Sequence, residues 1–150
     1  MKKTTIIEGV AILYEILFLY TGISKLMEYS VFKEQIADSP VLPAFAKPIA
    51  LSIPWLEFAL VILLFIPRWR LIGLYGSLIL MTLFTGYIIA ILSSGDQLPC
   101  SCGGIIELMS WDQHLIFNGV FILLAIIASI LQRQHIKVQR PPNSTATYPG

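Results

Sequence analysis

Four long apolar segments constrain the fold of this chain more than any other feature. A helix needs about 20 consecutive apolar residues to cross a hydrocarbon core of about 30 Å. The segments lie at about 6–27, 49–66, 71–92 and 111–131, and the third has no charge over its 22 positions. With 56% hydrophobic residues, 13% charged residues and a mean hydropathy of +0.77, the composition is that of a membrane protein. We therefore predict an all-α membrane protein, a four-transmembrane-helix bundle over residues 1–131.

Polar stretches connect and follow these spans. Residues 27–47 mix charges with prolines, so we expect an external loop with a short interfacial helix at Val31–Ala37. Residues 132–150 are rich in basic, proline and small polar residues, a composition typical of disorder. We predict a disordered cytoplasmic tail there.

The basic residues are distributed unevenly between the two sides that four spans create. Three lie on the side of the external loop, namely Lys33, Lys47 and Lys25 at a helix end. The other seven lie on the side of the termini: Lys2, Lys3, Arg68, Arg70, Arg133, Lys137 and Arg140. Because Lys and Arg concentrate in cytoplasmic loops, we expect cytoplasmic termini in the inner or plasma membrane and an extracytoplasmic loop at 93–109. The net charge of +1, without a basic cluster, excludes nucleic-acid binding.

Two carboxyl groups fall inside the predicted spans. Glu15 is near the middle of the first span, and Glu57 is one turn beyond Pro54 in the second. Ionisable residues inside a membrane are costly and usually face the bundle interior. We expect both side chains to face inward, where they can converge. Two interpretations stay open for each: a hydrogen bond to a polar partner, or a proton relay or cofactor contact.

Both cysteines of the chain, Cys100 and Cys102, are separated by one residue in the extracytoplasmic loop and are followed by two glycines. A disulfide between them closes a tight ring, so we expect it to be strained and easily reduced. In an oxidising compartment such a pair can cycle between thiols and disulfide. The spacing therefore favours a redox pair, with metal binding or a structural role as alternatives.

The fourth span begins with a capping-box pattern. The hydroxyl of Ser110 can accept from the amide of Gln113, whose side chain can reach back to Ser110. His114 falls in the same first turn, where we expect a neutral imidazole near the cysteine loop, able to accept a thiol proton. An interfacial hydrogen bond is the alternative role for His114.

With these residues placed, the chain resembles the DoxX-like membrane proteins and, more narrowly, the MauE (methylamine-utilisation) branch. The resemblance runs from the first span to the end of the fourth, and the segments that carry it are Leu19–Leu26, Pro54–Glu57, Leu80–Tyr87, Pro99–Gly104 and Ser110–His114. It implies a four-helix membrane protein associated with redox or disulfide chemistry. For MauE it implies maturation of a periplasmic, disulfide-rich dehydrogenase subunit in methylamine metabolism. The chain is also similar to quinone-linked thiol oxidases of the DsbB and vitamin K epoxide reductase type, although those use C-x-x-C and a second cysteine pair.

Our first hypothesis is therefore a membrane thiol–disulfide oxidoreductase whose catalytic residues are Cys100, Cys102 and His114. It would exchange disulfides with an exported protein. Electrons would pass to a thioredoxin-like carrier or to a quinone held near Glu15 and Glu57.

Two further hypotheses come from other functional classes. Soft thiolates at Cys100 and Cys102, with His114 or Met109, could bind or transport copper or zinc. Alternatively, the chain is a non-enzymatic assembly partner that holds other subunits through the small residues Gly73 and Ser77.

Overall fold

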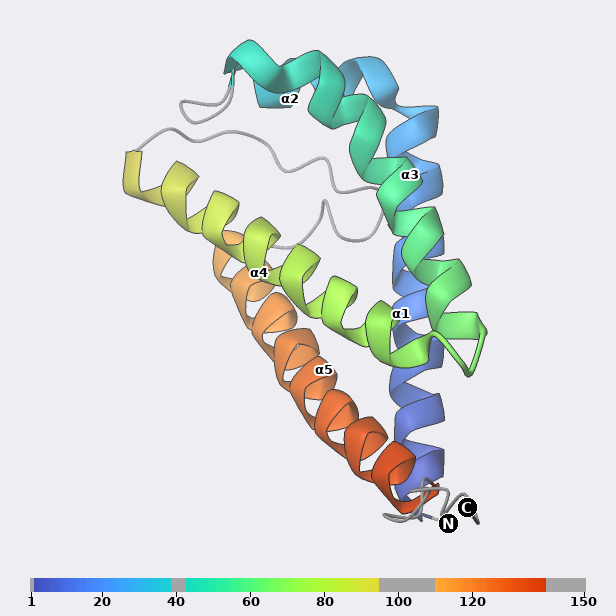
Figure 1. Cartoon of the computed structure of the whole chain (residues 1–150). Coiled ribbons are helices and arrows are strands. Elements are labelled where there is room, and N and C mark those ends of the chain that lie inside the picture. The colour runs from blue at the N-terminus through green and yellow to red at the C-terminus, as the bar shows by residue number, and fades with distance from the viewer. Residues whose placement is uncertain (1, 39–42, 95–109, 140–150) are drawn as a thin grey trace, which may run out of the picture.

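The computed structural model describes residues 2–38, 43–94 and 110–139, and four of its helices, α1, α3, α4 and α5, are long and apolar enough to cross a membrane (Figure 1). The predicted four-helix membrane fold is confirmed. A shorter helix, α2, follows α1 where the sequence predicts an interfacial helix. The elements are α1 (Lys2–Met27), α2 (Tyr29–Asp38), the 3-10 helix η1 (Pro43–Phe45), α3 (Ala46–Phe65), α4 (Arg70–Ser94) and α5 (Trp111–Gln139).

The first and last helices are longer than predicted. α5 continues to Gln139, so residues 132–139 are helix and the predicted tail from 132 is wrong over this stretch. α1 begins at Lys2, and Lys3 Nζ donates to Gln134 Oε1 at 3.3 Å. This exposed hydrogen bond links the two polar helix ends. The same contact places the start of α1 and the end of α5 at one end of the bundle, as an even number of spans requires.

The four long helices form two closely packed pairs. α1 packs mainly on α3, and α4 mainly on α5. In Figure 1, α1 and α3 run side by side, whereas α4 and α5 run obliquely to them. α5 meets α1 near the start of α1, and α4 starts beside the end of α3. The buried core joins both pairs through Tyr14, Phe18, Leu60, Leu64, Leu74, Met81, Ala125 and Ala128.

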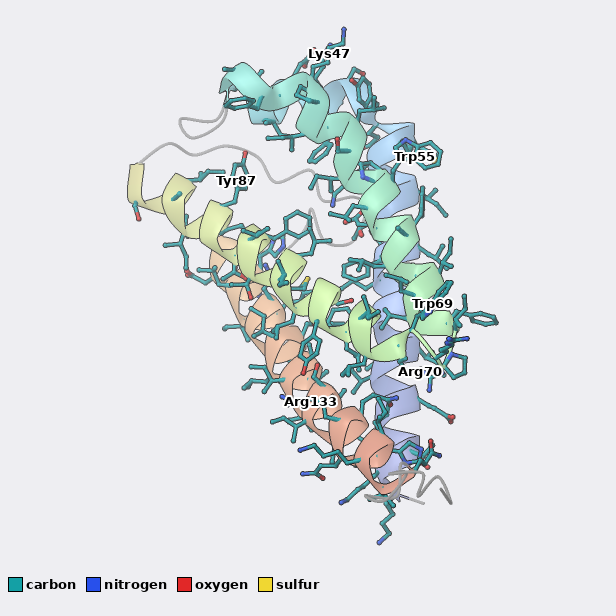
Figure 2. All side chains as sticks on the ribbon, viewed as in Figure 1. Lys47, Trp55, Trp69, Arg70, Tyr87 and Arg133 are labelled. Atoms are coloured by element: carbon teal, nitrogen blue, oxygen red, sulfur yellow. The ribbon has the colours of Figure 1, made fainter. Side chains whose placement is uncertain are left out.

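The turn between α3 and α4 is tight because Gly73 lets two helix backbones approach. A Cβ added at Gly73 would lie 2.9 Å from the backbone N of Leu64. Pro67 cannot continue α3, and Arg70 Nε donates to Leu64 O at 3.1 Å, which satisfies a carbonyl at the end of that helix. Figure 2 shows Trp69 and Arg70 at this turn.

The small residues of α4 serve the fold of this chain. Residues of α3 fill the space beside Gly73, where a side chain would lie. Ser77 is fully buried, and its Oγ donates to Gly73 O at 2.7 Å. The predicted close helix approach at Gly73 and Ser77 is therefore confirmed. Its partner is α3 of the same chain, so the hypothesis that this face holds another subunit is wrong.

Candidate functional site

Cys100 and Cys102 lie in residues 95–109, outside the described part of the chain, as does Met109. The structure describes the start of the helix that follows them. The capping box is confirmed: Gln113 N donates to Ser110 Oγ at 3.3 Å, and Ser110 N donates to Gln113 Oε1 at 3.2 Å. This cap fixes the first turn of α5 and with it the position of His114, whose side chain is only 6% exposed.

Glu57 is at the centre of a buried polar cluster between α1 and α3. Its side chain is 0% exposed, and its Oε1 accepts a hydrogen bond from Lys25 Nζ at 2.6 Å. Thr21 Oγ1 lies 3.2 Å from the same oxygen and also donates to Leu17 O at 2.9 Å. Thr21 and Lys25 are one helical turn apart on α1, so both reach the same side of Glu57. The interpretation that Glu57 bonds to a polar partner is supported, and the partner is Lys25.

Lys25 is buried among aromatic rings as well as against Glu57. Its side chain is 4% exposed, and Nζ lies 4.5 Å from the ring centroid of Phe84 and 5.5 Å from that of Phe32. The cluster is thus built from α1, α2, α3 and α4. Lys25, Glu57 and Phe84 come from three of the sequence segments that carry the resemblance to the MauE proteins, and the cluster brings these segments together.

The sequence reasoning missed Lys25, which it assigned to the outer side as a helix-end residue. The sequence did contain a signal for this pairing. Thr21 and Lys25 follow an apolar run and are four residues apart, so they share one helix face. The next span carries Glu57, an acid without a basic residue in its own span. A buried carboxylate in a membrane requires a partner, and Lys25 is the base on the neighbouring span.

Glu15 does not join this cluster. Its side chain is partly buried and lies within electrostatic range of Arg70, at the turn between α3 and α4. Thr21 is six residues further along α1, about 9 Å at about 1.5 Å per residue and on a different face. The structure therefore separates Glu15 from the Lys25–Glu57 cluster, and a cofactor site near both carboxyl groups stays a prediction.

Buried polar groups also occur on α5. Asn118 and Ser129 are 2% and 3% exposed, and Asn118 Nδ2 and Ser129 Oγ have no hydrogen-bond partner among the described residues. Asn118 is one turn beyond His114, so these two residues share a face near the start of α5. The sequence reasoning did not identify Asn118 or Ser129, because single small polar residues in an apolar helix give no pattern.

No group of three or more His, Cys, Asp and Glu side chains that could hold a metal ion occurs within residues 2–38, 43–94 and 110–139. The ligands of the metal hypothesis other than His114 are outside these ranges. The described residues thus contribute one buried imidazole and one buried ion pair as candidate functional groups.

Comparison with protein families gives a match. The model of the methylamine utilisation protein MauE matches residues 3–131, which include the Lys25–Glu57 cluster, both cysteines and His114. Comparison with curated proteins and with solved structures returned no match. Since the match covers most of the chain and the fold has the expected four spans, this membrane protein belongs to the MauE family.

Proposed function

We propose that the protein exchanges thiols and disulfides with an exported protein, in maturation of the methylamine-utilisation type, through Cys100 and Cys102. Membership of the MauE family supports this proposal. The observation that carries it is the capped start of α5, which holds a buried imidazole at His114, twelve residues after Cys102 in the sequence. A thiol pair and a base near one membrane face are the groups that this exchange needs.

The exchange proceeds by two thiolate attacks. A thiolate of the exported protein attacks the Cys100–Cys102 disulfide, the bond between those sulfurs breaks, and a mixed disulfide forms. A second thiolate of the exported protein then displaces the remaining cysteine. The exported protein gains a disulfide and loses two electrons and two protons, and the cysteine pair becomes a dithiol. His114 takes a proton from an attacking thiol.

Regeneration of the disulfide requires an acceptor of two electrons. A thioredoxin-like disulfide carrier accepts them by the same exchange, and a membrane quinone accepts them with two protons to give a quinol. If the pair instead starts as a dithiol, it attacks a disulfide of the exported protein and reduces it. Both directions use the same mixed disulfide.

The orientation follows from the basic residues. Because Lys25 is buried against Glu57, only Lys33 and Lys47 remain on the side of the cysteine loop, against seven basic residues at the other side. In Figure 2, Lys47 and Arg133 lie toward opposite ends of the bundle. The cytoplasmic side carries the positive excess, so the termini are cytoplasmic and the cysteines extracytoplasmic. A C-terminal reporter that is active only outside the cytoplasm would overturn this orientation.

Labelling of intact cells with a membrane-impermeant maleimide tests the cysteine chemistry. Labelling that appears only after mild reduction supports an extracytoplasmic disulfide, and the double variant Cys100→Ser/Cys102→Ser is the control that should not label. Equal labelling with and without reductant would falsify the redox proposal. Labelling that Cu(I) blocks would instead support metal binding by the thiols.

Single-cysteine variants then identify the exported protein. Cys100→Ser and Cys102→Ser should each abolish function about equally, because one thiol cannot complete the exchange alone. In each variant the remaining thiolate should attack a disulfide of the exported protein, displace one of its sulfurs and accumulate as a mixed disulfide that reductant releases. His114→Ala should slow the exchange without preventing it, and full activity of this variant would remove His114 from the mechanism.

A further inference from the structure

The Glu57 carboxyl group is hydrogen-bonded at one oxygen only. Oε1 accepts from Lys25 Nζ at 2.6 Å, whereas Oε2 is buried and has no donor among the described residues. A buried ion pair recovers its desolvation cost only where the remaining lone pairs are also satisfied. An ionised Glu57 therefore leaves one oxygen of the carboxylate uncompensated inside the membrane.

The backbone of α1 packs closely beside Oε2 at Gly22. A Cβ added at Gly22 would lie 3.3 Å from Glu57 Oε2 and 2.8 Å from Phe58 Cε1. A buried water needs free volume and two to four polar partners, and the described residues give Oε2 no hydrogen-bond partner. A proton needs neither, because it binds the oxygen itself.

Lys25 keeps favourable partners whether or not Glu57 is charged. Its Nζ lies over the rings of Phe84 and Phe32, and a cation over an aromatic face is stabilised more strongly when it is desolvated. A protonated Glu57 can still accept the Lys25 hydrogen bond at Oε1. The cluster can therefore exist with Glu57 ionised or neutral while Lys25 stays an ammonium.

We propose that Glu57 takes up and releases one proton at Oε2, which makes the Lys25–Glu57 pair a proton-exchange site inside the membrane. With Glu57 ionised the pair has no net charge, and with Glu57 protonated it has a net charge of +1. The proton comes from water at the nearer membrane surface and returns there, and no electrons move. α1 ends at Met27, two residues beyond Lys25, so the pair is close to one end of this span. This proposal does not rest on the cysteine chemistry.

Lys25 is the charged group that acts on Glu57. α2 and α4 present the rings of Phe32 and Phe84 to the pair rather than charges. The other charged side chains nearby in the chain are exposed, directed to other partners or at the far end of the bundle: Glu28 between α1 and α2, Lys33, Glu34 and Asp38 of α2, Lys47 of α3, and Arg70 of α4. A titration of the cluster therefore reports on Glu57 beside Lys25.

Infrared spectroscopy of the full chain in lipid bilayers tests this proposal. Over a pH series, the carboxylic acid C=O band of a buried glutamic acid should appear and disappear reversibly and should shift in D₂O. We expect Glu57→Gln to lose this band and Glu15→Gln to keep it. Glu15 is the matched control because it is the other carboxyl that the sequence places deep in a span.

Two results would overturn the proposal. One is a wild-type spectrum in which the acid band is absent at every pH or does not change with pH, which means that Glu57 keeps one protonation state beside Lys25. The other is a band that Glu15→Gln removes and Glu57→Gln leaves in place.

Glu57→Asp keeps the test decisive if Glu57→Gln does not fold. The shorter side chain retains a carboxyl group but moves it relative to Lys25 and Gly22, so the band should remain with a changed frequency and a changed titration midpoint. An identical band and midpoint in Glu57→Asp would assign the signal to another residue. The Cys100→Ser/Cys102→Ser protein should give the wild-type band, which separates this result from the thiol proposal.

Discussion

Two regions along α1 fix this helix to its neighbours through different interactions. The Glu57 region, comprising Thr21, Gly22, Lys25 and Glu57, joins α1 to α3 through a buried ion pair. The Glu15 region, comprising Tyr14, Glu15 and the adjacent α3–α4 turn, relies on apolar packing and close backbone contact. Both regions carry a glutamate in a span, yet Glu57 is fully buried and Glu15 only partly.

Tyr14 shows how the Glu15 region is held. Its side chain is 0% exposed, and its hydroxyl donates to Phe121 O at 2.6 Å. The Tyr14 and Phe121 rings meet edge to face with centroids 5.1 Å apart. This arrangement satisfies the polar atom of the tyrosine fully, whereas the Glu57 region leaves one carboxylate oxygen without a donor. The comparison shows that the Glu57 region holds a buried polar atom without a hydrogen-bond partner among the described residues. The buried hydroxyl of the Glu15 region has such a partner.

The largest expected effect is that of Lys25→Met. At a pH at which Glu57 is ionised, removal of one partner leaves its charge buried and unpaired, which costs about 3–5 kcal/mol in buried ion pairs. Equilibrium unfolding in mixed micelles measures this loss. Arg70→Met, which removes the charge near Glu15, is the control and should cost about 1 kcal/mol, mainly through its hydrogen bond to Leu64 O.

The double variant Lys25→Met/Glu57→Leu sharpens this comparison. Replacement of a whole buried pair by apolar residues is often neutral or stabilising. We expect stability to return to within about 1 kcal/mol of the wild type, with loss of the infrared band. A double variant as unstable as Lys25→Met would show that the two residues do not act as a pair.

Gly73→Ala should have the next largest effect, because it acts on the backbone contact near the Glu15 region. The added Cβ meets the Leu64 backbone at 2.9 Å, and overpacking of this kind costs about 1–3 kcal/mol. Gly86→Ala on the same helix is the matched control. A Cβ there meets nothing within 4 Å, so we expect a gain of about 0.5–1 kcal/mol from helix propensity. Equal stabilities for the two variants would contradict the close packing at Gly73.

Tyr14→Phe should have a smaller effect. It keeps the ring contacts and removes one hydrogen bond, which is worth about 0.6 kcal/mol on average between membrane helices. Tyr75→Phe, at a partly lipid-exposed position of α4, is the control and should be unchanged. The same unfolding titration compares both variants with the wild type.

Glu15→Gln should have the smallest effect, within about 0.5 kcal/mol, because a partly buried side chain can find a polar environment without the charge. Glu57→Gln should cost more, because Lys25 then lacks its opposite charge. If the two variants were equally stable, the distinction between the two regions would have no energetic basis.

Local sequence patterns predicted the contacts that form between residues close together in the sequence. The capping box at Ser110 and Gln113 and the small-residue face of Gly73 are both as expected, because spacing along one helix fixes these contacts. Thr21, Lys25 and Asn118 were missed, because their roles depend on which helices become neighbours and in which register. The end of α5 was placed too early for the same reason, since Gln134 accepts a hydrogen bond from Lys3 of α1.

The sequence by itself determined four membrane spans, the helix start at Ser110 and the asymmetry of basic residues, because length, hydropathy and local capping are properties of single segments. Only the tertiary structure decided that Glu57 pairs with Lys25 while Glu15 lies apart, near Arg70. The physical reason is register: the antiparallel packing of α1 on α3 places Lys25 opposite Glu57. Depth along a span can be read from one helix, but the partner of a buried charge depends on how two helices align.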